Sequence, residues 1–234
     1  MTPQPPKIAK KHMPEGIEIL HEDVDLIVGS KAPGILTVAA LWERVHTVQN
    51  SLDLYLRKGN LRSNKCVFVV HRLDQATSGI LIFAKAESVQ MFLKDNWSST
   101  TKYYYAIVHG RLEKKTGLIE SFLLEDEDYV VRSTKNTQQG KKAQTEYAVV
   151  KETDRFSVVK IKLLTGKKNQ IRVHMAELGH PVVGDQKYGK ADSRQKELLL
   201  HSFSIEFNHP FKNQRVRFQS DVPTYFNKIV DYKY

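Results

Sequence analysis

Residues 67–84 read VFVVHRLDQATSGILIFA, a run in which nine mostly polar residues separate two apolar segments. Both apolar segments are rich in β-branched and aromatic residues, so they predict buried strands. The connection from His71 to Gly79 is longer than a simple hairpin needs, because hairpin loops usually take about two to five residues. It places an imidazole, a guanidinium and a carboxylate within four consecutive positions. This pattern is typical of a functional loop held by a rigid sheet.

The residues of this loop also have a purely structural interpretation. Asp74 could cap a turn, and Arg72 could pair with it at the surface, where an ion pair contributes little. The choice between the two interpretations therefore depends on the rest of the chain.

The composition favours a nucleic-acid partner. The 234 residues include 36 Lys and Arg against 26 Asp and Glu, which gives a formal net charge of +10 and a pI near 9.5. Such a bias attracts polyanions, although a basic surface that serves only solubility has the same composition. The hydrophobic fraction of 41% is normal for a globular protein and allows one substantial core or two small ones.

Cysteine content and hydropathy indicate a cytoplasmic protein. The only cysteine, Cys66, excludes an intramolecular disulfide and a thiolate zinc cluster. No apolar run approaches the roughly 20 residues that span a bilayer, and the N-terminal residues lack the apolar core of a signal peptide. Residues 1–15 combine prolines with lysines and predict a flexible basic arm, and residues 16–234 are expected to form a single domain.

Hydrophobic periodicity predicts further elements on both sides of the loop. Ser88 is the expected N-cap of one helix, and Gly179 the expected left-handed C-cap of another. The expected helices lie in residues 45–55, 88–97 and 170–178. The expected strands lie in residues 17–28, 35–38, 102–110 and 157–163. Acidic and basic segments, 125–128 and 132–142, are expected to flank a protruding hairpin or loop.

Three further blocks accompany the loop, in the order KYYYAIVHG (102–110), TGKKNQIRVH (165–174) and LGHPVVGD (178–185). Together they resemble the RluA-type RNA pseudouridine synthases, which carry HRLDxxTSG, KxYxAxVxG, TGRxHQIRVH and LGHPIxGD. The resemblance extends from about Gly16 to the C-terminal end. It implies a member of the family without the N-terminal S4 domain that many members have.

The resemblance implies an α/β fold of the α+β type. Its features are a long, mixed, mostly antiparallel curved sheet, flanking helices and loops, and an active-site cleft across the middle. The implied reaction isomerises specific uridines in RNA to pseudouridine, with no cofactor and no metal. The base is cut from ribose C1′ at N1, turns, and is rejoined through C5. The implied partner is a stem-loop of ribosomal RNA, transfer RNA or both, and we expect a monomer.

The resemblance also implies roles for individual residues. Asp74 is the expected nucleophile, and Arg172 is expected to pair with it, because a carboxylate in a closed cleft needs a nearby cation to stay ionised. Tyr104 is expected to stack on the target base and to help remove the C5 proton, although composition alone also allows Tyr103 or Tyr105 to point inward.

Base flipping and RNA contact involve a second set of residues. Chemistry on a base in folded RNA requires its extrusion from the stack. Arg72 is the expected wedge that fills the vacated space, with a phosphate clamp as its alternative role. Further residues expected to bind the RNA are His71, for which a structural role is favoured, Thr77, Lys167, Lys168, Asn169, Gln170 and Ile171.

The chain departs from the family pattern at three places. Lys167 and Asn169 stand where the family commonly has Arg and His, so the guanidinium fork and a titratable ring are both lost. Residues 31–34, KAPG, shift the proline of the usual KPxG turn. The changes at Lys167 and Asn169 do not touch the expected nucleophile, so we expect activity with altered substrate contacts.

Three other functions stay open at this point. An Asp nucleophile also suits hydrolysis of a glycosidic bond in nucleosides, although most glycosidases use two carboxylates. A non-catalytic RNA-binding module would need none of the three expected catalytic residues. A metal-dependent phosphodiesterase would need ligands whose spacing matches no known pattern, namely His71, Asp74, His174, His180 and Asp185.

Overall fold

The computed structural model describes residues 13–58, 60, 62–189, 195–212 and 214–234. Most of the predicted N-terminal arm lies outside these residues. The chain divides into two compact units, one formed by Met1–Thr100 with Ile205–Ser220, and the other by Thr101–Ser204 with Asp221–Tyr234. Strand β10 (Leu200–Asn208) runs from the second unit into the first. A single domain over residues 16–234 therefore stays a prediction.

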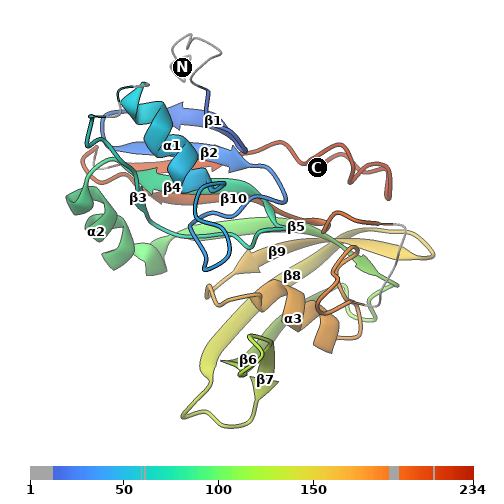
Figure 1. The fold of residues 1–234 in the computed structure, drawn as a ribbon. Helices are drawn as coiled ribbons and strands as arrows, with labels where there is room; N and C mark the ends of the chain where they lie inside the picture. Colours follow the sequence, from blue (N-terminus) through green and yellow to red (C-terminus); the bar gives the residue numbers. More distant parts are fainter. Residues whose placement is uncertain (1–12, 59, 61, 190–194, 213) are drawn as a thin grey trace. The chain divides into compact units, whose positions relative to one another are not determined.

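The first unit is a sheet with helices (Figure 1). Strand β2 pairs antiparallel with both β1 and β4, and β4 is buried along its whole length, as its continuous apolar sequence predicts. Val89 and Leu93 of α2 pack against Ile80 and Ile82 of β4 in one core. The strands are β1 (Ile17–Glu22), β2 (Leu26–Lys31), β3 (Phe68–Val69), β4 (Ser78–Ala84) and β11 (Arg215–Gln219). The helices are α1 (Val48–Arg57), α2 (Glu87–Asp95) and the 3₁₀ helix η2 (Trp97–Ser99).

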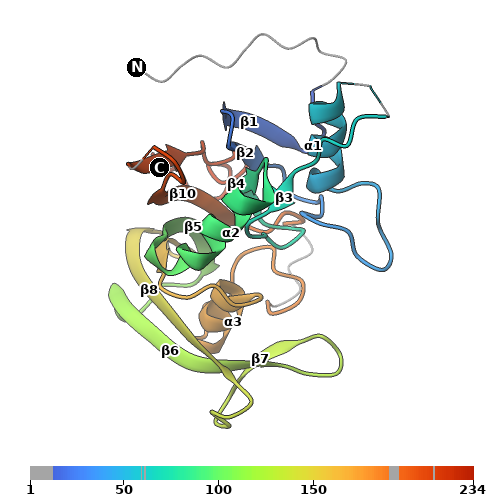
Figure 2. The ribbon, with the colours of Figure 1, turned by 90° about the vertical axis from the view of Figure 1, so that its left-hand side faces the viewer.

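The second unit is an antiparallel sheet with strand order β5-β9-β8-β6-β7. Helix α3 (Gln170–Glu177) packs against β7 and β8, and Val173 contributes to the core beneath it. Figure 2 shows β6 and β8 as long, curved strands beside α3. The strands are β5 (Thr101–His109), β6 (Thr116–Glu125), β7 (Val131–Thr134), β8 (Lys141–Glu152) and β9 (Phe156–Leu163).

The predicted mixed α/β fold is confirmed, together with most of its elements. The expected strands 102–110 and 157–163 appear as β5 and β9, and residues 116–134 form the β6–β7 hairpin. Gly179 has the predicted left-handed conformation, with φ +86°. In the described part of the chain, no helix is long and apolar enough to cross a bilayer. The cleft across the sheet stays a prediction.

Several predicted boundaries are wrong, because local hydrogen bonds decide where an element starts. The first helix begins at Val48, since the Thr47 side chain accepts the N–H of Asn50 and caps the helix there, which leaves Val45 outside. Ser88 lies inside α2, whose N-cap Ala86 makes no side-chain bond. Residues 35–38 form only an isolated bridge, from Leu36 to Thr47.

Candidate active site

The loop that carries Asp74 is held at its N-terminal side by Thr37. The Thr37 hydroxyl donates to the Leu73 carbonyl at 3.0 Å and accepts the Leu73 N–H at 3.2 Å. Both groups are buried, so these bonds are shielded from water. The backbone immediately before Asp74 is therefore fixed in both hydrogen-bonding directions.

The same loop is held at its C-terminal side by the turn that follows β2. The Gln75 carbonyl accepts the Gly34 N–H at 2.8 Å and the Lys31 ammonium at 2.9 Å, and the Gln75 side chain donates back to the Gly34 carbonyl. The Asp74 carbonyl accepts the Thr77 N–H at 3.1 Å. These bonds place the Asp74 side chain on a backbone that is ordered on both sides.

Lys31 is a buried cation behind this loop that the sequence patterns do not identify. Its side chain is 1% exposed, and its ammonium donates to the carbonyls of Ala32, Ile35 and Gln75. Burial lowers the pKa of Lys31 to about 7, and the Asp74 carboxylate opposes this shift in part. Its sequence signals are its place as the first residue of the KAPG turn and its position at the end of β2, where alternation puts it on the same face as Ile27.

Replacing Lys31 is expected to change the free energy of unfolding by an amount that depends on pH. Between about pH 7 and 10.5 the unfolded chain keeps the Lys31 proton and the folded chain releases it, so stability rises with pH over this window. We expect the difference in unfolding free energy between the wild type and Lys31→Met to increase across it, as measured by urea unfolding at several pH values. Lys94→Met, which changes an exposed lysine, is the control. If the difference in unfolding free energy between the wild type and Lys31→Met did not change with pH, the lowered pKa of Lys31 would be contradicted.

The polar residues on either side of Asp74 differ in exposure. Arg72 is exposed, so its guanidinium is accessible to a ligand. His71 accepts the N–H of Ile82 in β4 through Nε2 at 3.1 Å, and its ring lies 4.8 Å from that of Trp97. These contacts support the structural role predicted for His71. Thr77 is buried, so any effect on RNA binding would be exerted through the loop.

In the second unit, Arg172 of α3 forms a two-pronged ion pair with Asp185. Its Nε and Nη2 each donate to one Asp185 carboxylate oxygen at 2.8 Å, and the two side chains are 11% and 0% exposed. Burial raises the pKa of Asp185, but the bonds from Arg172 outweigh it and leave the pKa below its usual range. Because a guanidinium has about five N–H donors, Arg172 can bind Asp185 and a further acceptor at once.

Asn169 and Tyr188 complete the surroundings of this arginine. The Asn169 side chain accepts from Arg172 at 3.2 Å and donates to the Tyr188 hydroxyl at 2.9 Å, while Arg172 lies 5.1 Å from the centre of the Tyr188 ring. Asn169 has φ +54°, a left-handed conformation that asparagine tolerates well. The departure from histidine at this position therefore keeps a hydrogen-bonding support for Arg172. Tyr188 is a second residue that the motif comparison does not identify.

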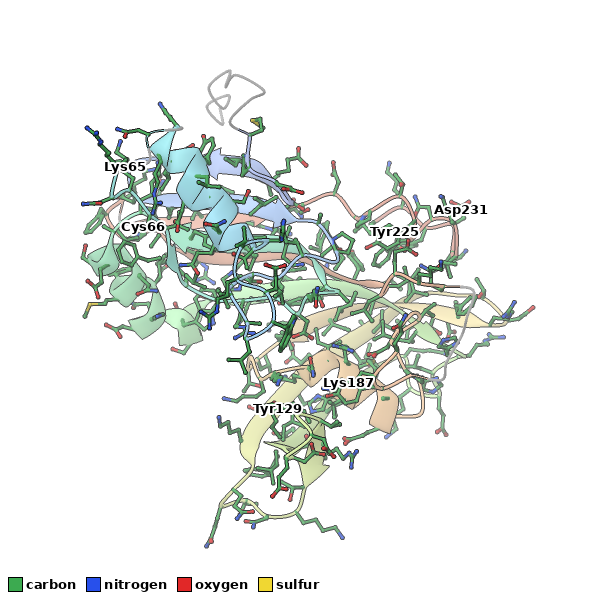
Figure 3. All side chains as sticks on the ribbon, viewed as in Figure 1. Lys65, Cys66, Tyr129, Lys187, Tyr225 and Asp231 are labelled. Carbon is green, nitrogen blue, oxygen red and sulfur yellow. The ribbon has the colours of Figure 1, made fainter. Side chains whose placement is uncertain are left out.

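The tip of the β6–β7 hairpin is fastened near this network. The Lys187 ammonium donates to the Tyr129 carbonyl at 2.7 Å, and Figure 3 labels both residues. The Lys168 ammonium lies 5.5 Å from the centre of the Tyr129 ring and also pairs with Glu125. Lys168 and its neighbour Lys167 are both exposed, so phosphate binding by these lysines stays a prediction.

Tyr104 lies on the sheet face that α3 covers. Tyr104 is paired with Ile161, and Ile161 with Tyr147, which shares its face with Thr145 two residues earlier. The Thr145 hydroxyl bonds to the side chains of two α3 residues, Gln170 and His174. Tyr104 therefore lies on the face of the second unit that α3, the helix of Arg172, covers.

The neighbouring tyrosines occupy the opposite face. Tyr103 lies beneath the Lys160 ammonium, and Tyr105 packs edge-on against Phe203 and Tyr234. Alternation along β5 places both away from Tyr104. Tyr104 and Tyr105 are both buried, and Tyr104 is the one on the face that α3 covers, while its role toward the target base stays a prediction. Asp74 belongs to the first unit, so its pairing with Arg172 stays a prediction.

Gln170 and Ile171 have buried side chains. The Gln170 amide donates to the Gln144 carbonyl and to Thr145, and its oxygen accepts from Thr165 and the Lys167 N–H. The side chain thus holds the start of α3 to β8. Any contribution of Gln170 and Ile171 to RNA binding would act through this placement.

The ligand set considered for a metal-dependent phosphodiesterase is divided between the two units, with His71 and Asp74 in the first and His174, His180 and Asp185 in the second. Among the described residues, the one group of His, Asp and Glu donors within 4.8 Å of one another is Asp23, Asp25 and His209, none of which belongs to that set. Asp23 in this group already binds the Lys212 ammonium. Asp185 of the considered set is occupied by Arg172.

Comparison with known proteins gives one family. Residues 25–177 match the family model described as RNA pseudouridylate synthase. The ribosomal large subunit pseudouridine synthase D of Borreliella burgdorferi is 36% identical over 90% of this chain and 66% of its own length. The chain thus spans about two thirds of that relative. The dual-specificity RNA pseudouridine synthase RluA of Vibrio cholerae is 33% identical over 83% of this chain and 78% of its own.

Solved structures have the same fold. The human RNA pseudouridylate synthase domain containing 4 superposes with a TM-score of 0.75, at 20% identity, over 89% of both chains. The human RNA pseudouridylate synthase domain containing 1 gives a TM-score of 0.71 at 24% identity, over 92% of this chain and 86% of the other.

Proposed function

Because this chain belongs to the RNA pseudouridylate synthase family, whose reaction isomerises uridine to pseudouridine in RNA, we propose that Asp74 is the nucleophile of that reaction. The observation that carries the proposal is the anchoring of the Asp74 loop. Thr37 bonds the residue before Asp74, and Lys31 and Gly34 bond the residue after it. A nucleophile on a backbone fixed in this way reaches its target atom with little further ordering.

The chemistry needs one ionised carboxylate and no cofactor. The bond from ribose C1′ to N1 breaks and a bond from C1′ to C5 forms, while C5 loses a proton and N1 gains one, so the composition of the RNA does not change. A carboxylate can form and release a covalent adduct during these steps. Arg172 would keep Asp74 ionised when RNA covers the site, because desolvation alone favours protonation.

Tyr104 and Arg72 have separate roles in this proposal. Tyr104 would stack on the target uracil and assist removal of the C5 proton, since it lies on the sheet face that α3, the helix of Arg172, covers. Arg72 would enter the RNA stack when the uridine leaves it. Its exposure beside Asp74 supports this role, because a wedge must reach the RNA from the rim of the loop that acts on the base.

The proposed substrate is a stem-loop of ribosomal RNA, transfer RNA or both. One relative is named for the large ribosomal subunit and another for dual specificity toward RNA. The excess of ten positive charges supports binding to a phosphate backbone. A cytoplasmic location, a monomeric state and independence from metals are further parts of the proposal.

Release of tritium tests the proposed reaction directly. RNA labelled with tritium at C5 of uridine is expected to lose label to water in the presence of the protein and a chelator, because C5 exchanges its hydrogen for the bond to C1′. The nucleosides obtained from the digested RNA are expected to include pseudouridine. Free uracil as the product would instead indicate glycosidic hydrolysis, and a strict requirement for one metal ion would contradict the proposed mechanism.

A further inference from the structure

A loop with an exposed tryptophan lies between β2 and α1, and the proposed function gives it no role. Leu41, Trp42 and Val45 are 86%, 77% and 63% exposed, which is unusual for large apolar side chains so close together in one loop. Figure 2 shows this blue segment projecting away from α1. We refer to residues 38–46 as the tryptophan loop.

The tryptophan loop is ordered in spite of its exposure. Its two ends are bridged from Leu36 to Thr47, and the Val48 N–H donates to the Leu36 carbonyl. Within the loop, the Glu43 carboxylate accepts the N–H groups of Val45 and His46. The apolar side chains are therefore presented from a defined backbone, which lowers the entropic cost of binding a partner.

The base of the tryptophan loop is bonded to the Asp74 loop. Thr37, which immediately precedes the tryptophan loop, exchanges two hydrogen bonds with Leu73, between Arg72 and Asp74. Five residues span at most about 18 Å, so Trp42 stays within that distance of this anchor. A nucleic acid that places a uridine at Asp74 therefore passes within reach of Trp42.

We propose that the tryptophan loop binds RNA beside the target uridine and stacks Trp42 on an unpaired base. This inference rests on the proposed function, because it takes the target uridine to lie at Asp74. Aromatic side chains stack on unpaired bases of RNA, and the exposed Arg44, two residues after Trp42 in the same loop, supplies a positive charge for a nearby phosphate. The net charge of +10 on the whole chain favours RNA as the partner.

Tryptophan fluorescence can report this contact directly, because the chain has two tryptophans. Trp97→Phe leaves Trp42 as the sole reporter. With a short RNA stem-loop that has uridines in its loop, we expect its emission to be quenched and its accessibility to iodide to fall. A fully paired RNA duplex of the same length should quench it much less, since it offers no unpaired base.

The affinity for the same stem-loop tests how much the Trp42 side chain contributes to the free energy of RNA binding. Trp42→Ala is expected to raise the Kd about tenfold or more, and Trp42→Phe to raise it less, because a smaller ring still stacks. Phe211→Ala removes another exposed aromatic side chain of the same unit and should leave the Kd unchanged. Circular dichroism checks that all three variants are folded.

The two proposals fail in distinguishable ways. An unchanged Kd for Trp42→Ala, with tritium release intact, would overturn the inference and leave the proposed function standing. Trp42-dependent RNA binding without tritium release by the wild type would overturn the proposed function. If Trp42→Ala abolishes self-association in sedimentation experiments but not RNA binding, the loop is a protein interface and the inference is wrong.

Discussion

Asp74→Asn is expected to lower the rate of tritium release at least about a thousandfold, while the protein stays folded and binds RNA. An amide has nearly the same shape as a carboxylate but is a far weaker nucleophile. The loop should keep its conformation, because the bonds that hold it are made by the backbone of Leu73 and Gln75. The loss should therefore appear in the rate of the bound complex rather than in the Kd for RNA.

The comparison needs a variant that makes the same chemical change elsewhere. Asp95→Asn alters an exposed residue at the end of α2, in the same unit, and should release tritium at the wild-type rate. Asp74→Asn and Asp95→Asn are then compared for rate, RNA affinity and thermal unfolding. Full activity of Asp74→Asn would exclude Asp74 as the nucleophile.

Asp185→Ala is expected to destabilise the protein by about 3–5 kcal/mol, because it leaves the Arg172 guanidinium largely buried without its carboxylate partner. Activity should also fall, since the two bonds from Asp185 orient Arg172 on α3. Urea unfolding measures the first effect and tritium release the second. Asp185→Asn keeps the side-chain volume and one hydrogen-bond acceptor, so it should lower stability and activity by less than Asp185→Ala.

A double variant separates the structural effect from the catalytic one. In Arg172→Met with Asp185→Leu, both charges are replaced by apolar side chains of similar size, which often restores the stability lost on breaking a buried pair. We expect this variant to unfold close to the wild type and to remain inactive. If the double variant were active, Arg172 would have no part in catalysis. If Asp185→Ala were as stable as the wild type, the ion pair would contribute nothing to the stability of the fold.

Local patterns predicted much of the fold. The alternation over residues 102–110 predicted β5, and the helical spacing before Gly179 predicted α3, because both elements repeat their apolar residues at the period of the structure. The N-cap predicted at Ser88 is wrong because α2 already begins at Glu87, after an N-cap, Ala86, that makes no side-chain hydrogen bond and therefore leaves no capping signal in the sequence. The strand predicted at 35–38 is only a bridge, because Thr37 bonds to Leu73 instead of to a neighbouring strand.

The residues of the candidate site also differ in how far the sequence alone predicts them. The order of the motifs was enough to predict the family and to select Asp74, Tyr104 and Arg172 as candidate catalytic residues, because each of them stands at a fixed place in a motif. The supporting residues Asp185 and Lys31 also stand in motif blocks, LGHPVVGD and KAPG, but a motif does not show which group each of them binds. Asp185 lies thirteen positions from Arg172, and Lys31 lies 44 positions from Gln75, so only the folded chain brings each pair together.

The loop at residues 71–79 illustrates what the sequence determines and what the tertiary structure determines. By itself, the sequence determined that a carboxylate, an arginine and a histidine lie between two strands, because strand propensity and turn length are local properties. The structure confirms burial for β4 along its whole length, whereas the strand predicted at 67–70 is only the two-residue, half-buried β3. The tertiary structure alone decided that Thr37 holds one side of Asp74, that a buried Lys31 holds the other, and that the exposed Trp42 lies on the same anchored segment. Those contacts depend on burial and on hydrogen bonds between segments distant in the chain, which no local pattern encodes.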